Sequence, residues 1–440
     1  MKKIYSVGLL VCLLAACKPD LKTSAPKPGN ADFSVYLAVG NSLTAGYADN
    51  SLYLTGQQNS YPLRLSEQFK LVGGGAFKQP LLMSDVGLPS QKLILGLSTS
   101  CLGVTSLSPI PDPQPVNWAD TASIAAQGPF NNVGVPGIRC IDYIVPGYAL
   151  LAKAGGIPYA SRFFANPAAR PLDEALRIKA TFFTCWLGSN DVLLYATDGG
   201  QGNDPGTNVK PYADISAPAF FDAAYNIVID SLTSNGAKGA LMNIPDVTAI
   251  PFFTTVPINA LVLRKGQADS LNAAYQGLNG IRFAAGANNF VVQDHNGVPK
   301  QIQQGEYILL TVPQDSLTCA GWGSLKPIPS QYVLTSEEVA NVKAATLAYN
   351  TTIQTTATNH NLAYIDMNSY LKTLTAGITF DGAAYNATFV TGGAFSLDGV
   401  HLTPRGYALA ANFIIQGINA KYSSTIPAVD ANKYSGVKFP

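Results

Sequence analysis

A serine near the N-terminus stands in a setting that favours nucleophilic chemistry. Ser42 lies between Gly40 and Gly46, directly after a short apolar run. In an open α/β sheet the reactive groups stand at the carboxyl ends of strands, which is where such a run would place Ser42. A serine hydroxyl is a weak nucleophile at neutral pH and needs an adjacent base. The alternative is a simple turn residue, because serine beside glycine is common in turns.

A base of the required kind lies near the other end of the chain. His401 follows Asp398 by three residues, across a glycine and ahead of an apolar helical pattern. A carboxylate at that spacing can bond one ring nitrogen, which leaves the other free to face a serine. Of the two other histidines, His295 lies in a turn-like run and His360 ends a predicted helix, so both are interpreted as surface residues. Taken alone, the Asp398–His401 pair also fits a cap at the start of a helix.

Two further short motifs supply hydrogen-bond donors. The run NVGVPG covers residues 132–137, and GSND covers residues 188–191 after a strand-like run. A tetrahedral oxyanion needs preorganised donors, typically backbone N–H groups and an asparagine side chain. Gly137 allows close backbone approach, and Asn190 offers a side-chain N–H. Each motif alone also fits an ordinary turn, and Asp191 is interpreted as a helix cap.

These residues need a scaffold that brings distant segments together. Apolar runs alternate with helical patterns, which predicts an α/β fold with a mainly parallel sheet. The predicted strands are Phe33–Val39, a short run before Gly134, Thr181–Leu187, Gly239–Ile244 and Leu362–Met367. The predicted helices are Tyr61–Phe69, Pro218–Ser234, Asn259–Leu278, Ser336–Asn359 and Pro404–Ala420.

Three stretches do not fit this alternation. Residues 72–128, 196–217 and 285–334 are rich in glycine, proline and other turn residues or contain broken β-like runs. We interpret them as loop or cap insertions over one face of the sheet, and not as separate domains. Residues 31–425 are thus predicted as a single domain, followed by a C-terminal tail over 426–440.

Taken together, the four motifs resemble the SGNH, or GDSL-like, hydrolase superfamily. They occur in the family's order: GNSLTAG in place of the usual GDSL block, NVGVPG, GSND, and DGVH as the block that carries the histidine. The resemblance implies a flavodoxin-like three-layer α/β/α fold. It also implies that Ser42 is the nucleophile and His401 the base, oriented by Asp398. The N–H groups of Ser42 and Gly137 and the side chain of Asn190 would then form the oxyanion hole.

The sequence departs from the family pattern at two points. Asn41 replaces the usual aspartate before the nucleophile; that aspartate is no member of the triad, so activity is expected to survive. The gap from Ser42 to Gly137 is also longer than in compact members. The insertion over 72–128 accounts for it, and for this reason the substrate is not inferred from compact relatives.

The first residues predict export and anchoring. Lys2 and Lys3 precede a short apolar segment that is too short to span a bilayer, so residues 1–16 are interpreted as a signal peptide. The signal ends in LAAC, which resembles a bacterial lipobox and makes Cys17 the expected site of lipidation. An ordinary signal peptide with an incidental cysteine is the alternative. Residues 17–30 then form a lipidated tether, and the protein is expected in the bacterial cell envelope, held to the membrane by lipid.

The composition of the chain argues against a nucleic-acid partner and against a metal cofactor. The chain has 28 basic and 27 acidic residues and no Lys/Arg-rich run, so no nucleic-acid partner is expected. No Cys/His spacing suggests a metal site, and the chemistry requires neither metal nor organic cofactor. Four cysteines remain after the N-terminal segment, namely Cys101, Cys140, Cys185 and Cys319, and the sequence does not choose between the pairings. Cys185 sits in an apolar run, where a buried free thiol is expected.

The sequence therefore predicts a serine esterase that forms an acyl-enzyme on Ser42. The alternative is a catalytically idle surface lipoprotein that binds a glycan or lipid in the same cleft. Loops that leave the carboxyl ends of the strands surround such a cleft. Apolar residues on two of these loops are expected either to line an acyl pocket or to pack the insertions onto the sheet: Leu81, Leu82, Met83, Leu88, Leu93, Ile94, Leu95, Ile250, Phe252 and Phe253.

Overall fold

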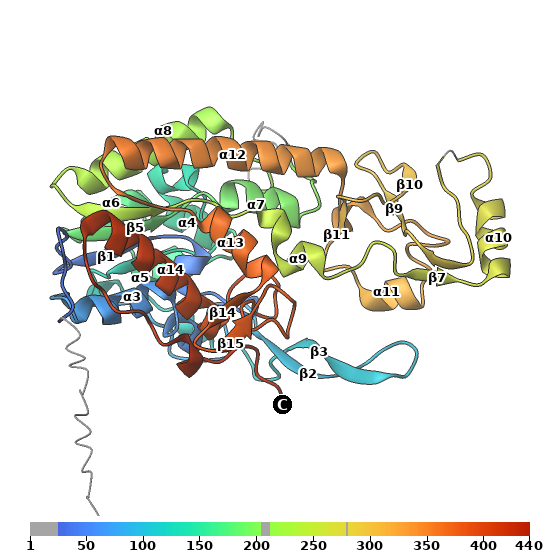
Figure 1. The fold of residues 1–440 in the computed structure, drawn as a ribbon, viewed down its shortest axis with the longest axis horizontal. Helices are drawn as coiled ribbons and strands as arrows, with labels where there is room; N and C mark the ends of the chain where they lie inside the picture. The colour runs from blue at the N-terminus through green and yellow to red at the C-terminus, as the bar shows by residue number, and fades with distance from the viewer. Residues whose placement is uncertain (1–24, 204–211, 279) are drawn as a thin grey trace, which may run out of the picture.

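The computed structural model describes residues 25–203, 212–278 and 280–440. At its centre is a parallel sheet of five strands: β1 (Tyr36–Gly40), β4 (Asn132–Gly134), β5 (Phe182–Trp186), β6 (Lys238–Met242) and β13 (Ala363–Ile365). Their order across the sheet is β13-β6-β5-β1-β4. Counted along the chain this is the 2-1-3-4-5 order of flavodoxin-like folds. The predicted three-layer α/β/α fold is confirmed (Figure 1).

The central strands are continuous apolar runs because helices cover both faces of the sheet. Every residue of β1 and of β5 is buried. One helical layer contains α3 (Tyr61–Lys70) and α14 (Pro404–Tyr422), and the other contains α8 (Pro218–Thr233) and α12 (Ser336–Asn359). The main hydrophobic core fills the space between the sheet and these layers.

The strand order reverses beside β1, and this positions the chemistry. The next strand along the chain, β4, lies beside β1 on one edge of that strand, and the following strand, β5, lies beside β1 on its other edge. The carboxyl ends of β1 and β5 therefore flank the crevice in which open α/β sheets bind ligands. Ser42 follows β1 and Asn190 follows β5, so both residues stand at this crevice.

The remaining elements are short. The other helices are α1 (Ser42–Ala45), α2 (Leu54–Gln57), α4 (Tyr148–Ala154), α5 (Tyr159–Phe163), α6 (Pro171–Leu176), α7 (Asn190–Thr197), α9 (Pro251–Thr254), α10 (Lys265–Ala274), α11 (Gln314–Thr318) and α13 (Met367–Ala376). The paired short strands are β2 (Leu93–Thr99) with β3 (Thr105–Pro111), β7 (Leu261–Leu263) with β8 (Gly286–Asn288), β9 (Val291–Gln293) with β10 (Pro299–Gln301), β11 (Tyr307–Ile308) with β12 (Val333–Leu334), and β14 (Ile378–Phe380) with β15 (Ala383–Tyr385).

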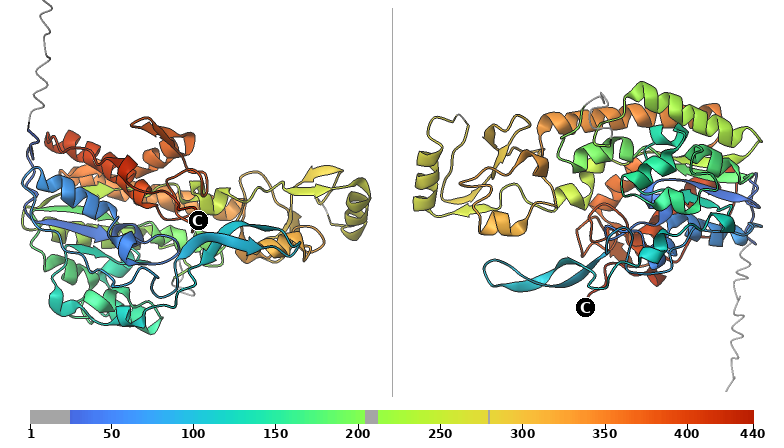
Figure 2. Two further views of the ribbon diagram at one scale, coloured as in Figure 1. Left: turned by 90° about the horizontal axis from the view of Figure 1, so that it is seen from below. Right: turned by 180° about the vertical axis from the view of Figure 1, so that it is seen from behind.

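Two inserted segments extend past the carboxyl ends of the central strands. The β2–β3 hairpin and the segment from about residue 256 to 334, here called the lobe, lie side by side in Figures 1 and 2. The lobe contains small apolar clusters of its own, apart from the main core. The insertion predicted over 285–334 is thus part of a larger segment. In the insertion predicted over 196–217, residues 204–211 lie outside the described part of the chain.

The helix predicted over Asn259–Leu278 is present as α10 but is shorter, covering Lys265–Ala274. Leu261–Leu263 form β7, which pairs with Gly286–Asn288, and α10 begins only at Lys265. The apolar side chains that suggested the start of a helix are taken up by this pairing. The helix is then started by a cap, because Gln267 accepts a hydrogen bond of 2.9 Å from the backbone N–H of Arg264.

The two ends of the described fold pack against each other. Lys27 and Thr425 exchange two hydrogen bonds of 2.9 Å, and the Asn30 N–H donates to the Tyr422 carbonyl at 2.7 Å. Ile426 in the predicted tail is buried. Parts of the segments predicted as tether and tail therefore belong to the packed structure. Cys17 and the predicted signal peptide over 1–16 lie outside the described residues.

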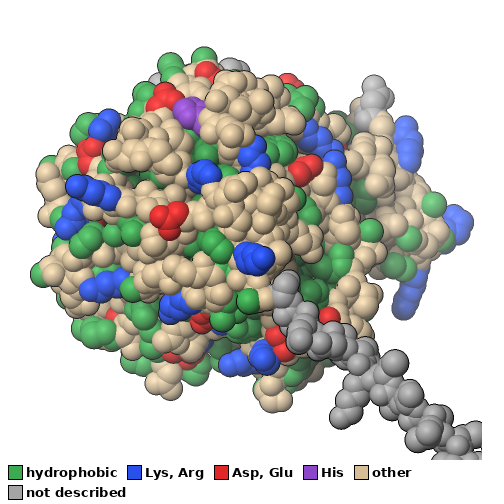
Figure 3. Space-filling view, turned by 60° about the vertical axis from the view of Figure 1, so that its left-hand side comes forward, with side chains coloured by type: hydrophobic (Ala, Val, Ile, Leu, Met, Phe, Trp, Pro, Cys, Tyr) green, Lys and Arg blue, Asp and Glu red, His purple; other side chains and the backbone are tan. Residues whose placement is uncertain are grey.

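The outer surface mixes charges of both signs. On the face shown in Figure 3, Lys and Arg side chains are interspersed with Asp and Glu side chains. Among the helices of the described residues, none combines the length and the apolar character needed to cross a bilayer.

Candidate active site

Ser42 begins α1 immediately after β1 and contacts the predicted base. The residue before it, Asn41, caps the helix, since its side-chain oxygen accepts a hydrogen bond from the Leu43 N–H at 3.1 Å. Ser42 Oγ lies 2.8 Å from His401 Nε2. The structure thus brings together two residues separated by 359 positions in the chain. The distance suits direct proton transfer from the hydroxyl to the imidazole.

Asp398 holds the opposite side of the imidazole. Its Oδ2 lies 2.9 Å from His401 Nδ1, and its Oδ1 accepts hydrogen bonds of 2.8 Å from the N–H groups of Val400 and His401. Burial acts to raise the pKa of Asp398, but the charge and hydrogen bonds of His401 and the N–H of Asn50 lower it by more, so the pKa lies well below its usual value. The ionised carboxylate accepts a hydrogen bond from Nδ1–H and leaves Nε2 to face Ser42.

A tight turn that the sequence reading missed supports this arrangement. Asp49 and Asn50 have φ values of 50° and 62°, so both adopt the left-handed conformation of a type I′ turn. The Asp49 N–H donates to Ser396 Oγ at 3.0 Å, and the Leu397 N–H donates to Asp49 Oδ1 at 3.0 Å. The Asn50 N–H donates to Asp398 Oδ2 at 2.9 Å. The signal in the sequence is the Asp-Asn pair, because these residues tolerate positive φ.

An aromatic ring fixes the imidazole from a further side. The rings of Tyr47 and His401 lie 4.6 Å apart between centroids, at an angle of 50°. Tyr47 is itself held in place, because the Tyr407 hydroxyl donates to the Tyr47 carbonyl at 2.6 Å. Since Tyr407 belongs to α14, the helix that follows His401 also positions the loop that follows Ser42.

The residues predicted as oxyanion donors lie on adjoining loops. Asn190 starts α7, and its Nδ2 donates to the Ile138 carbonyl at 2.9 Å, next to Gly137. An asparagine amide has two N–H donors, so one remains for a ligand. Gly137 has a φ of 81°, a conformation that L side chains rarely adopt. Asn190 lines the cavity beside Ser42, whereas Gly137 is not among the residues that line it; Gly137 is adjacent to Ile138, whose carbonyl accepts the hydrogen bond from Asn190.

The prediction that Asp191 caps its helix is wrong. The residue at the cap position is Ser189, and Asp191 turns inward, where its Oδ2 accepts a hydrogen bond of 2.6 Å from the Cys140 N–H. Burial raises the pKa of Asp191 to about 7, although the hydrogen bond from Cys140 acts in the opposite direction. The carboxyl group therefore links the loop that carries Asn190 to the loop that carries Gly137.

A narrow apolar cavity opens beside Ser42 and His401. It has a volume of about 80 Å³. Much of its wall comes from α13, an element that the sequence reading did not predict. The side chains of α13 in this wall are Met367, Tyr370, Leu371 and Leu374. The other apolar residues of the wall include Trp186, Leu193, Val247, Ile250 and Phe395. The apolar lining suits a hydrocarbon chain attached to a carbonyl group at Ser42.

Most of the apolar loop residues that were expected either to line an acyl pocket or to pack the insertions onto the sheet do not line the cavity beside Ser42. Ile250 does line the cavity, but Phe253 is buried in the core beside Tyr307. Leu82 and Leu88 are also core residues. Phe252 and Leu93 line a different cavity, between the hairpin and the lobe. The sequence places all of these residues in loops after strands but does not indicate which way each loop turns.

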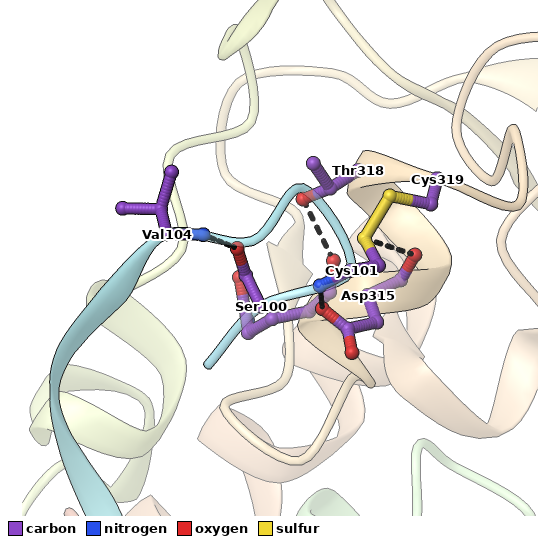
Figure 4. The surroundings of a disulfide bond; sticks show 7 residues. Ser100, Cys101, Val104, Asp315, Thr318 and Cys319 are labelled. Atoms are coloured by element: carbon purple, nitrogen blue, oxygen red, sulfur yellow. Dashed lines mark hydrogen bonds between the residues drawn. A yellow bond between two sulfur atoms is a disulfide. The ribbon is translucent and has the colours of Figure 1, made fainter. Parts of the chain in front are cut away.

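The other histidines and the cysteines lie away from Ser42. His295 is 3.8 Å from Glu338, and the His360 ring contacts Asp230 at 3.0 Å. Cys101 and Cys319 form a disulfide (Figure 4), while Cys140 and Cys185 are free and buried, which confirms the expectation for Cys185. The described residues contain no group of three or more Cys, His, Asp or Glu side chains that could hold a metal ion.

The comparisons with known proteins give no family. No protein-family model matches the chain, and no curated protein matches it. The functional argument therefore rests on the site. A hydroxyl, an imidazole and a buried carboxylate stand in a hydrogen-bonded line beside an apolar cavity, and this arrangement can deprotonate the hydroxyl as it attacks an electrophile.

Proposed function

We propose that this protein is a serine esterase that hydrolyses a carboxylic ester through an acyl-enzyme on Ser42. The observation that carries the proposal is the continuous line from Ser42 Oγ to His401, at 2.8 Å, and from His401 to Asp398, at 2.9 Å. A serine needs such a base to become a nucleophile, and the base needs a third group to fix its tautomer. The resemblance of the four motifs to the SGNH hydrolases supports the same assignment.

The proposed reaction has two steps, acylation of Ser42 and hydrolysis of the acyl-enzyme. Ser42 Oγ attacks the ester carbonyl carbon while its proton passes to His401 Nε2. The negative charge on the carbonyl oxygen is stabilised by the N–H groups of Ser42 and Gly137 and by the Asn190 amide. The intermediate collapses, and the departing alkoxide takes the proton from His401 to leave as an alcohol. Water then attacks the acyl-enzyme, with His401 again accepting and returning a proton, and releases the acid and free Ser42.

The cavity favours an apolar acyl group. Its wall is formed largely by aliphatic and aromatic side chains, and Ser42 and His401 are among the residues that line it. An acyl chain buried there leaves water, which stabilises binding by about 0.8 kcal/mol for each methylene group. The narrow volume favours a single unbranched chain over a bulky acid.

The test is covalent labelling combined with turnover. A fluorophosphonate should label the wild-type protein once, at Ser42, and short-chain p-nitrophenyl esters should be hydrolysed. Ser42→Ala should lose both signals at an unchanged melting temperature. The matched control is Ser66→Ala, because Ser66 is also buried but lies on α3. A protein that binds lipid or glycan but shows neither labelling nor turnover would be the idle binding lipoprotein instead.

We also propose that the chain is held to the bacterial envelope through lipid on Cys17. The LAAC run supports this, as does the first described segment, which bonds to the C-terminal end of α14 and lies at the end of the sheet opposite the hairpin and lobe (Figure 1). A tether at that end would leave the candidate site facing away from its point of attachment. Cys17→Ser should abolish fatty-acid labelling and release the protein from the membrane fraction, and retention after the substitution would refute lipid anchoring.

A further inference from the structure

Two hydrogen bonds, here called the clamp, join the loop after β4 to the start of α7. Asn190 Nδ2 donates to the Ile138 carbonyl at 2.9 Å, and the Cys140 N–H donates to Asp191 Oδ2 at 2.6 Å. The helix contributes two consecutive residues, of which the first is a predicted oxyanion donor. The loop contributes residues that directly follow Gly137, the other predicted donor outside the nucleophile. The clamp therefore connects the two segments that would form the oxyanion hole.

Water does not reach the clamp. Asp191 and Cys140 are fully buried, and Asn190 is nearly so. The Asp191 carbonyl also accepts a hydrogen bond of 2.9 Å from the Ser216 N–H, so the start of α7 is fixed from a second direction. Loss of the Asp191 carboxyl would leave the buried Cys140 N–H without its acceptor, which is costly because no water can replace it. The spacing between the loop and the helix is thus set by this bond.

The loop side of the clamp is stiff. The Arg139 backbone N–H and its guanidinium both donate to the Asp142 carboxylate, at 3.0 Å and 2.8 Å. Both residues are buried, and the two bonds close the chain on itself around Cys140. Because this segment is braced internally, holding Cys140 also holds Gly137, which lies three positions earlier.

We propose that Asp191 is a positioning residue of the oxyanion hole, which keeps the Gly137 N–H and the Asn190 amide at a fixed spacing around the carbonyl oxygen of the ester. This inference rests on the proposed esterase function. An oxyanion hole is effective because its donors are in place before the negative charge develops. Asp191 does not line the cavity beside Ser42, so it acts through its neighbours and not on the substrate.

Asp191→Ala tests the proposal through the transition state. The substitution should lower kcat by about 10- to 100-fold with little change in KM, because misplaced donors meet the developing charge poorly. The affinity for an alkyl trifluoromethyl ketone should fall by a similar factor, since the ketone adds to Ser42 as a tetrahedral species with a charged oxygen. Asp191→Asn should restore both values, because its amide oxygen can accept from the Cys140 N–H. Rates are expressed per Ser42 that a phosphonate labels at completion.

The matched control is Asp120→Ala. Asp120 is also a buried carboxylate, and its Oδ1 accepts a backbone N–H, that of Met83, at the same distance of 2.6 Å. It does not line the cavity beside Ser42 and contacts neither segment of the clamp in the hydrogen bonds that it makes. Its removal should lower the melting temperature but leave kcat and the ketone affinity of the folded protein at their wild-type values.

Asp191→Ser is the second variant if the alanine variant does not fold. A serine hydroxyl with a bound water can pair the Cys140 N–H, although at a less fixed distance. If a folded variant of Asp191 loses melting temperature but keeps the wild-type kcat and ketone affinity, as expected for Asp120→Ala, Asp191 is only a structural residue and the proposal is overturned. Wild-type protein that neither hydrolyses esters nor binds the ketone would instead refute the esterase function, and this inference with it.

Discussion

Asp49 accepts a hydrogen bond of 3.0 Å from the backbone N–H of Leu397, the residue directly before Asp398. The contact joins the loop that follows the candidate nucleophile to the loop that carries the candidate acid and base. The neighbouring Asn50 N–H donates to Asp398 itself at 2.9 Å, and the Tyr53 hydroxyl holds the other oxygen of Asp49 at 2.6 Å. These hydrogen bonds hold two loops from opposite ends of the chain in fixed positions relative to each other. The distance between Ser42 and His401 depends on those positions.

We predict that Asp49 is a positioning residue. Asp49→Ala should lower kcat by roughly 10- to 100-fold with little change in KM, because small displacements of reacting groups are costly. Asp49→Asn should keep most of the activity, since an amide oxygen still accepts from Leu397 and the amide nitrogen can donate to the Tyr53 hydroxyl. Steady-state kinetics with a p-nitrophenyl ester check the split. If both variants lose stability and activity alike, Asp49 is only a structural residue.

Asp398→Asn should separate orientation of the histidine from stability. The variant retains an oxygen for the N–H groups of Val400 and His401 but can place an N–H against His401 Nδ1, which forces the wrong tautomer. By analogy with serine hydrolases that lose their aspartate, kcat should fall by about 10³- to 10⁴-fold. KM and the fluorescence-monitored melting temperature are measured in parallel. An unchanged kcat would reduce Asp398 to a capping residue.

Asn190→Ala tests the oxyanion hole. The side chain makes one visible hydrogen bond, to the Ile138 carbonyl, and its second N–H is available to an oxyanion. Loss of one such donor costs about 10²- to 10³-fold in kcat in other hydrolases. Phosphonate labelling at Ser42 should slow in proportion, because the same donors stabilise that adduct. An effect on KM alone would assign Asn190 to ground-state binding.

The residues that carry the proposed chemistry could be predicted from the sequence because each has a local signal in it. Ser42 and Asn190 follow apolar strands, and the Asp398–His401 spacing across a glycine is local. The supporting contacts were not accessible, since the partner of Asp49 lies 348 residues away. Helix α13 was missed for a similar reason. The apolar run of β13 ends at Ile365, and Asp366 then caps the new helix through the Ser369 N–H.

The buried carboxyl of Asp191 should give the protein a recognisable pH dependence of stability. Burial raises its pKa to about 7 in the folded protein, from an ordinary value of 3.8. Between these values the folded protein binds a proton that the unfolded chain has released, so stability falls as pH rises through this window. Asp191→Asn keeps an acceptor for the Cys140 N–H and removes the titration. The melting temperature of the variant minus that of the wild type should therefore increase as the pH rises from about 4 to about 8. A difference that stays constant across that range would contradict the assignment.

The wall of the cavity beside Ser42 should set the length of the acyl chain that the protein hydrolyses. Leu374 on α13 is buried and lines the cavity beside Ser42. Leu374→Phe should shorten the space available to an acyl chain. Since contacts with a few methylene groups change discrimination by about 1–3 kcal/mol, kcat/KM for octanoyl esters should fall by about 10- to 100-fold relative to acetyl esters. Hydrolysis of the acetyl ester should persist, because Ser42, His401 and Asn190 are untouched.

Phe253→Ala is the matched control for this profile. Phe253 is just as buried but packs against Tyr307 in the core, outside the cavity wall. Its truncation should lower the free energy of unfolding by about 3–5 kcal/mol through loss of packing. The ratio of octanoyl to acetyl hydrolysis should stay at the wild-type value in the fraction that remains folded. If instead Phe253→Ala alters that ratio while Leu374→Phe leaves it unchanged, the acyl chain lies toward α9 and the assignment of the α13 cavity is wrong.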